Sequence, residues 1–178
     1  MGFYIFGKGG GNNNVTLSSI LDRSITELTS SITSLGAYAL GNCSKLTSLN
    51  LPEVISCGSY AMQNCTALTD ISMPKVNVLG NFCFYQCRVL KKVYLPSINQ
   101  IGGNCFTGSG LETLIIPCTE LCVLVGNSFK DTPIEKGTGY IYVPSELAEE
   151  YKTATNWTVY GEQIRAIEDY PDICGGIV

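Results

Sequence analysis

Residues 42–54 read Asn-Cys-Ser-Lys-Leu-Thr-Ser-Leu-Asn-Leu-Pro-Glu-Val, and residues 64–76 read Asn-Cys-Thr-Ala-Leu-Thr-Asp-Ile-Ser-Met-Pro-Lys-Val. The two stretches carry their apolar residues and their proline at equal positions. The proline recurs as Pro52, Pro74, Pro96 and Pro117, so the successive spacings are 22, 22 and 21 residues. A repeat of this length is typical of a solenoid, in which each coil buries its apolar side against its neighbours.

Each proline is preceded by the apolar pattern L-x-x-L-x-L. The alternation in residues 48–51 predicts a half-buried strand, which ends at the proline because proline donates no hydrogen bond to a ladder. After each proline come an apolar residue and a glycine, where we expect a bend, and then about six residues, where we expect one helical turn. The apolar positions of the pattern are Leu46, Leu49 and Leu51, then Leu68, Ile71 and Met73, then Leu90, Val93 and Leu95, then Leu111, Leu114 and Ile116.

The pattern resembles the leucine-rich repeat family, and in particular its BspA-like branch, whose units read roughly Leu-x-x-Ile-x-Ile-Pro, Val-x-x-Ile-Gly, Ala-Phe-x-x-Cys. The resemblance runs from Ile32 to about Pro144. It implies a leucine-rich repeat solenoid, a right-handed β/α superhelix with short parallel strands that is mostly β and loop. We expect a linker and degenerate capping coil over residues 1–30, about five coils over 31–144, and a helical cap with a loose tail over 145–178.

The stretch after Pro144 is typical of a cap. Ser145 is a candidate N-cap residue, and the acidic residues that follow it favour a short helix. The segment is similar to the terminal module of BspA-like arrays, which implies that Trp157, Ile164 and Ile167 close the last coil. The alternative is that Trp157 stacks on a ligand.

The sequence contains nine cysteines, and most of them keep the period of the repeat. They stand in slots that other coils fill with small apolar residues, so we expect buried thiols rather than a disulfide or metal framework. If one disulfide forms, Cys118 and Cys122 are the best pair, because both lie outside the regular units. The predicted structural thiols are Cys43, Cys57, Cys65, Cys83, Cys87 and Cys105.

Composition excludes several classes of function. The net charge is −4 and the pI is about 4.8, so we expect no nucleic acid partner, and the apolar runs are too short for membrane insertion. The absence of histidine removes Ser-His and Cys-His catalysis and the commonest zinc ligand. The carboxylates are scattered, so paired-carboxylate chemistry is an alternative without support. We expect no enzyme, no metal and no cofactor.

The first residues resemble neither a signal peptide nor a phosphate-binding loop. Residues 1–14 lack a basic start, a long apolar run and a cleavage site, and residues 7–11 lack the order of a P-loop, so we interpret that glycine-rich stretch as a linker. Resemblance to BspA-like proteins instead implies a bacterial, secreted or cell-surface location.

Function is expected on the outward positions of the strands. There the repeat stacks two columns of side chains, the usual recognition surface of the family. Exposed aromatic residues mark contact sites, so Tyr94, Ile115, Tyr140 and Tyr142 are the candidate contact patch; the alternative is that such residues merely suit strand positions. The columns are Ser48, Asp70, Lys92, Thr113 and Tyr140, and Asn50, Ser72, Tyr94, Ile115 and Tyr142.

The resemblance implies a non-catalytic binding or adhesion module for a protein or glycan partner, such as a host or cell-surface component. The alternative is a structural spacer in a larger surface or phage-tail assembly.

Overall fold

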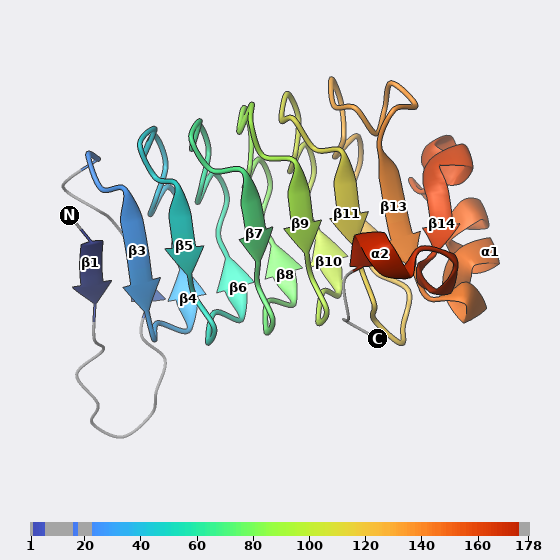
Figure 1. Cartoon of the computed structure of the whole chain (residues 1–178), viewed down its shortest axis with the longest axis horizontal. Coiled ribbons are helices and arrows are strands. Elements are labelled where there is room, and N and C mark those ends of the chain that lie inside the picture. The colour runs from blue at the N-terminus through green and yellow to red at the C-terminus, as the bar shows by residue number, and fades with distance from the viewer. Residues whose placement is uncertain (1, 6–15, 18–22, 175–178) are drawn as a thin grey trace.

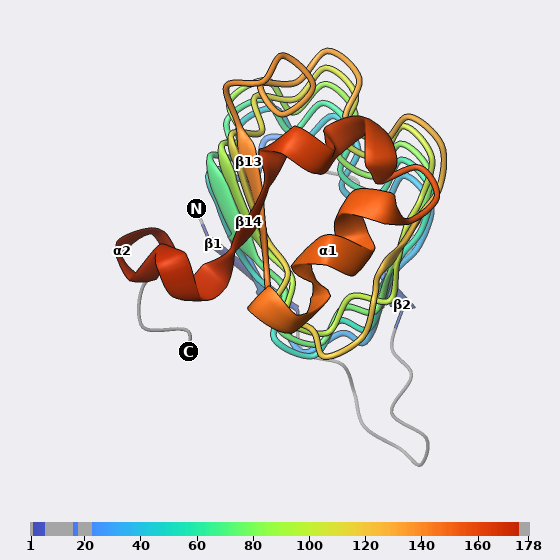
Figure 2. The same ribbon diagram turned by 90° about the vertical axis from the view of Figure 1, so that its right-hand side faces the viewer.

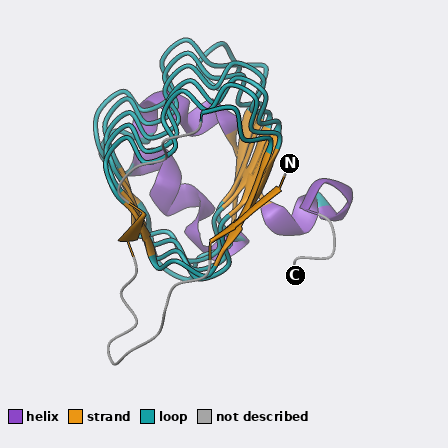
Figure 3. Cartoon of the chain, turned by 90° about the vertical axis from the view of Figure 1, so that its left-hand side faces the viewer, coloured by secondary structure: helices purple, strands orange, loops and turns teal. Residues whose placement is uncertain are grey.

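The chain forms an elongated solenoid in a computed structural model that describes residues 2–5, 16–17 and 23–174. Figure 1 shows the coils side by side along the long axis. Each regular coil contributes one strand to a front wall and a second strand to a back wall, and Figure 3 shows the two walls facing each other across the interior. The sequence predicted only the first strand of each coil.

The front strands pair in parallel in two sheets, with the orders β1-β3-β5 and β7-β9-β11-β13-β14. We call these two together the front sheet, and the outward surface of its strands the strand face. The front strands are β1 (Gly2–Ile5), β3 (Glu27–Ser30), β5 (Ser48–Asn50), β7 (Asp70–Ser72), β9 (Lys92–Tyr94), β11 (Thr113–Ile115), β13 (Tyr140–Val143) and β14 (Ile164–Ala166).

The back sheet is continuous, in the order β2-β4-β6-β8-β10-β12. From β4 to β12, each two-residue strand has one buried apolar residue, which is its second residue. Its strands are β2 (Thr16–Leu17), β4 (Ser34–Leu35), β6 (Ser56–Cys57), β8 (Val78–Leu79), β10 (Gln100–Ile101) and β12 (Val123–Leu124).

Equivalent residues of successive coils stack into one core. Phe84, Phe106 and Phe129 are buried, and their rings stack at centroid distances of 5.2 and 5.7 Å. The inward strand residues Val93 and Leu114 are likewise buried. This confirms the prediction that the repeated apolar positions share one interior.

The glycine that follows each of the back strands β6, β8 and β10 allows the coils to approach closely. A Cβ atom added to Gly80 would lie 2.6 Å from the backbone carbon of Gly58, and one added to Gly102 would lie 2.5 Å from that of Gly80. Because real Cβ atoms are never this close to backbone, only glycine fits there. The glycine therefore permits backbone contact between coils as well as the predicted bend.

The predicted helical turn after this glycine is absent from the described coils. Instead, alternate N–H groups point along the solenoid axis and donate to the next coil, for example from Met62 to the carbonyl of Cys83 at 2.9 Å. Tyr60 and Asn64 have φ angles of 60° and 55°, which interrupt any helix. The inter-coil hydrogen bonds offset the strain of these left-handed residues.

The C-terminal residues cover the open end of the solenoid. Figure 2 shows α1 (Ser145–Thr153) and η1 (Thr158–Gln163) lying across this end. Trp157 is buried, its indole N–H donates to the Cys122 carbonyl at 2.7 Å, and the Tyr151 hydroxyl accepts from the Cys122 N–H at 3.0 Å. Of the predicted cap residues, Trp157 and Ile164 are buried in the main core, whereas Ile167 is buried in a separate cluster with Ile115 and Tyr142 and does not close the last coil.

Two expectations at the ends differ from the structure. Ser145 is not the N-cap residue: Pro144 is, without a side-chain bond, and the Ser145 N–H donates to the Glu168 carboxylate at 3.0 Å. Part of the tail predicted over residues 169–178 is helical instead of loose: Pro171–Cys174 forms helix α2 after the 3₁₀ helix η2 (Ile167–Asp169).

At the other end, Gly2–Ile5 pairs with β3, whereas the glycine-rich stretch interpreted as a linker lies outside the described residues. No helix in the described part of the chain has the length and apolar character to cross a membrane.

Candidate functional site

Strand pairing fixes the two predicted columns of the strand face. From β7 to β13, Asp70 pairs with Lys92, Lys92 with Thr113, and Thr113 with Tyr140. In the second column Ser72, Tyr94, Ile115 and Tyr142 pair in the same order. The predicted register is therefore confirmed over this part of the sheet.

The two columns differ in exposure from what the sequence predicted. Ile115 and Tyr142 are buried, with exposed fractions of 0% and 3%, so the candidate contact patch is not open to solvent as a whole. They form a small cluster with Ile167, against which Tyr94, Tyr140 and Tyr170 pack. We call residues Ile167–Cys174, which comprise η2 and α2, the return segment.

The return segment lies on the outer surface of the front sheet. Figure 2 shows α2 outside the wall made by β13 and β14, and Figure 1 shows it in front of the C-terminal front strands. The Tyr170 ring meets that of Tyr142 edge to face at 5.4 Å, and Lys92 Nζ donates to the Ile173 carbonyl at 2.7 Å. Alternation along a strand predicts which side a residue faces but not which distant segment covers it.

Arg165 and Tyr170 were missed by the sequence prediction. The Arg165 guanidinium lies 4.5 Å from the Tyr140 ring centroid, a cation–π contact. The spacing of three between Ile167, Tyr170 and Ile173 is the signal that could have placed these residues on one side of a helical turn.

The rest of the strand face is open to solvent. Lys92, Tyr94, Thr113 and Tyr140 are half-buried, and the remaining predicted positions, Ser48, Asn50, Asp70 and Ser72, are exposed. The front sheet therefore has a covered C-terminal half and an open N-terminal half.

The front sheet is split between β5 and β7. Among the described residues no strand pairing joins these two strands, although β6 and β8 pair behind them in the back sheet. Leu49 is consequently only half-buried, whereas Val93 and Leu114, at the same position in later coils, are fully buried. Backbone groups along this edge of β7 are left without strand partners.

A groove of about 390 Å³ lies beside this split. Its lining combines a carboxylate, a hydroxyl, an ammonium group, an aromatic ring and an apolar side chain. A volume of this size is within the range of small-ligand sites or of a few side chains of a partner. The lining residues are Asp70, Ile71, Ser72, Lys92 and Tyr94.

The groove is held in shape by the neighbouring contacts. Lys92 is fixed by its bond to the Ile173 carbonyl, and Tyr94 packs against the buried cluster of Ile115 and Tyr142. Burial raises the pKa of Tyr94, and the nearby Cys118 adds to this shift, so the phenol stays neutral and can donate a hydrogen bond at neutral pH. No ion pair of the described residues involves Asp70 or Lys92.

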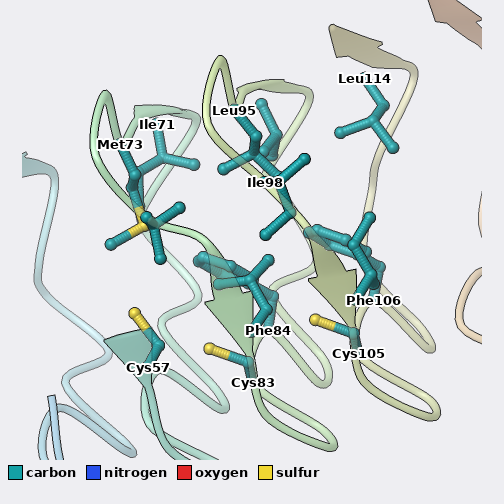
Figure 4. Close-up of a cluster of buried hydrophobic side chains, with 14 of the residues drawn as sticks. Cys57, Ile71, Met73, Cys83, Phe84, Leu95, Ile98, Cys105, Phe106 and Leu114 are labelled. Atoms are coloured by element: carbon teal, nitrogen blue, oxygen red, sulfur yellow. The ribbon is translucent and has the colours of Figure 1, made fainter. Parts of the chain in front are cut away.

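The cysteines line the core as thiols. Figure 4 shows Cys57, Cys83 and Cys105 in successive coils with their sulfur atoms directed inward. All six predicted structural cysteines are buried, and the eight cysteines from Cys43 to Cys122, Cys118 and Cys122 among them, are free. Burial raises the pKa of the Cys83 and Cys105 thiols well above the usual value, and that of Cys87 to about 12.

The described residues contain no group of three or more histidine, cysteine, aspartate or glutamate side chains arranged to hold a metal ion. The candidate site is therefore the groove with its polar and aromatic lining.

Residues 17–135 match the family described as BspA type leucine rich repeat region, in six copies. The chain belongs to this family. The match begins at residue 17, inside the predicted capping coil, and counts one copy more than the roughly five coils predicted from the proline spacing. In the structure β2 pairs with β4 in the back sheet and β3 pairs with β5 in the front sheet, so the first BspA-type unit contributes a strand to each sheet.

The BspA-type fold also occurs in a crystal structure of a leucine rich cell surface protein from Faecalibacterium prausnitzii A2-165. The two chains superpose with a TM-score of 0.58 and share 26% sequence identity. The alignment covers 68% of this chain and 33% of that protein, so the similarity spans about a third of the relative. No curated protein matches the chain.

Proposed function

We propose that this chain is a non-catalytic recognition module that binds a protein or glycan partner at the open half of the strand face. The observation that carries the proposal is the groove over β7 and β9, whose β7 side adjoins the split from β5 and therefore has strand-edge backbone groups beside Asp70 and Ser72. The groove offers hydrogen-bond donors and acceptors together with the Tyr94 ring, which suits a partner with both polar and apolar groups.

Surface display supports adhesion as the role of this binding. The relative of known structure is a cell surface protein, and it shares the solenoid over the aligned part. We infer an extracellular or cell-surface location for this chain, with the strand face presented to a host or neighbouring cell.

An array of oligosaccharides and matrix glycoproteins tests the proposal. The labelled full chain is compared with Asp70→Arg, at the groove, and with Gln100→Arg, which introduces the same guanidinium group at an exposed position of the back sheet. We expect at least one ligand whose retention falls tenfold or more in Asp70→Arg and stays unchanged in Gln100→Arg. Retention of nothing, or equal loss in both variants, would contradict recognition at the groove and favour a spacer role.

A further inference from the structure

The return segment is not needed to close the solenoid. The open end is covered by α1, η1 and β14, through buried residues such as Tyr151 and Trp157. After β14 the chain leaves this end and runs back across β13 and β11 toward β9, where the Ile173 carbonyl meets Lys92. The segment therefore covers a surface that, in the other half of the same sheet, is open.

The return segment contacts the strand face as a peptide ligand would. Tyr170 contributes an aromatic ring to Tyr142, Ile167 fills the space over Ile115, and Lys92 donates to a main-chain carbonyl. Any peptide with one or two helical turns could supply the same three features. These are an apolar residue, an aromatic residue three positions later, and a main-chain carbonyl three positions beyond the aromatic residue.

The segment is held by few groups. Beyond Ile167, only Tyr170 is even half-buried; the other side chains described, Glu168, Asp169, Pro171, Asp172 and Ile173, are exposed. The hydrogen bonds of Tyr170 N–H and Ile173 N–H lie within the segment itself, and two exposed hydrogen bonds attach it to the rest of the chain, from Lys92 Nζ to the Ile173 carbonyl and from the Ser145 N–H to the Glu168 carboxylate. Segments with little buried surface open more readily than the sheet beneath them.

We propose that the return segment is a built-in peptide ligand of the strand face, and that a partner's apolar peptide segment displaces it. The displacing segment carries a branched aliphatic and an aromatic residue three positions apart, as Ile167 and Tyr170 do. Once the return segment leaves, Ile115 and Tyr142 become accessible beside Tyr94, which also lines the open groove. The released surface and the groove then form one continuous site. This inference rests on the proposed function only because both place partner binding on the strand face.

Hydrogen exchange of the unmodified chain tests the opening step. The amides of Tyr170 and Ile173 bond within the return segment, whereas those of Leu95 and Ile116 bond across the front sheet. We expect the first pair to exchange at least 100-fold faster than the second pair. Equal protection of the two pairs would overturn the proposal, because the segment would then open only with the sheet.

Selection of a displayed library of 12-residue peptides tests the displacement. The targets are the wild-type chain, Tyr170→Ala and, as a matched control, Tyr85→Ala. Tyr85 is also half-buried, and its ring meets Phe82 edge to face at 5.7 Å on another surface. We expect peptides with the aliphatic–aromatic spacing to bind Tyr170→Ala at least tenfold more tightly than wild type or Tyr85→Ala, and to lose this binding when Lys92→Ala is added.

Failure to enrich such peptides, or equal binding to all three targets, would overturn the inference. The proposed function is tested separately, because Asp70→Arg and the ligand array concern the open groove. If the wild-type chain retains no ligand on the array while the peptide selection succeeds, the proposed function alone is contradicted.

Discussion

Gly102→Ala tests directly whether the close backbone approach between coils holds the solenoid together. The added Cβ atom would lie 2.5 Å from the Gly80 carbonyl carbon, 2.6 Å from the Asn81 nitrogen and 2.8 Å from the Gly80 oxygen. All three contacts are with backbone, which cannot turn away as a flexible side chain can. The two coils must therefore separate locally, which weakens the hydrogen bond from the Gly102 N–H to the Leu79 carbonyl, now 2.8 Å long.

The chain provides a matched control in the next residue. A Cβ atom on Gly103 would have its nearest neighbour, the Val125 carbonyl oxygen, at 3.5 Å, which is an ordinary contact. Both substitutions restrict the unfolded chain equally, by about 0.4–1 kcal/mol in favour of the folded state, so their difference isolates the steric contact. Overpacking costs about 1–3 kcal/mol and a weakened hydrogen bond about 1 kcal/mol, so Gly102→Ala should destabilise by roughly 2–4 kcal/mol relative to Gly103→Ala.

Thermal unfolding followed by circular dichroism measures this difference. For a chain of 178 residues, 1 kcal/mol corresponds to about 3 °C in Tm, so Gly102→Ala should melt roughly 6–12 °C below Gly103→Ala. Urea unfolding should show a lower midpoint with an unchanged slope. Equal melting temperatures for the two variants would refute the reasoning, because the coils would then tolerate a methyl group at their closest approach.

Three further outcomes follow from the core and the cap. The eight thiols from Cys43 to Cys122 should not react with Ellman's reagent in the folded chain and should react once urea unfolds it, with Cys174 counted separately; labelling of Cys57, Cys83 or Cys105 without unfolding would contradict their burial. Burial raises the Cys87 pKa from 9.0 to about 12, so the unfolded chain loses this proton at a lower pH than the folded chain and unfolding becomes more favourable as the pH rises through 9. The urea midpoint should therefore fall between pH 8 and pH 10.5 and stay constant from about pH 7 to pH 8. Trp157→Phe leaves the buried Cys122 carbonyl without its donor and should cost about 1–3 kcal/mol, measured by urea unfolding; an unchanged midpoint would contradict this.

The stacking of coils could be predicted because the repeat period equals one turn of the solenoid. Positions 22 residues apart must then become neighbours, which is why the pairing of Ile71 with Val93 followed from the sequence. The burial of Cys43, Cys65 and Cys87 followed for the same reason, since a residue that recurs at the period faces the same side in every coil.

The local structure after each glycine could not be predicted from the repeat alone. The six residues from Ser59 to Asn64 are enough for a helical turn, but their alternate N–H groups find acceptors in the next coil. A prediction from local sequence considers hydrogen bonds between residues close in the chain, whereas the backbone N–H groups of this segment donate to carbonyls of the next coil. Tertiary contacts therefore decided a conformation that local propensity left open.

The burial of Ile115 and Tyr142 was missed for a different reason. Both occupy outward positions of the strands, as predicted, but the return segment covers them from a distance of more than 20 residues in sequence. The aromatic and aliphatic residues at the C-terminal end of the second column are thus matched to an occupant within the same chain. Polar residues at the other end of the column have no such occupant among the described residues.

The split between β5 and β7 lies where the repeat pattern is most regular, which bears on where recognition sits. Leu46 to Pro96 shows no irregular spacing, and the back sheet stays paired behind the split, so the opening is confined to the front wall. A solenoid with a continuous core can lack the hydrogen-bond ladder between one pair of strands and still keep its coils packed. The neighbouring coils remain joined by buried side chains and by hydrogen bonds between their turns. The missing ladder therefore exposes the β7 edge beside the groove at small cost to stability, whereas an equal opening in the core could not be tolerated.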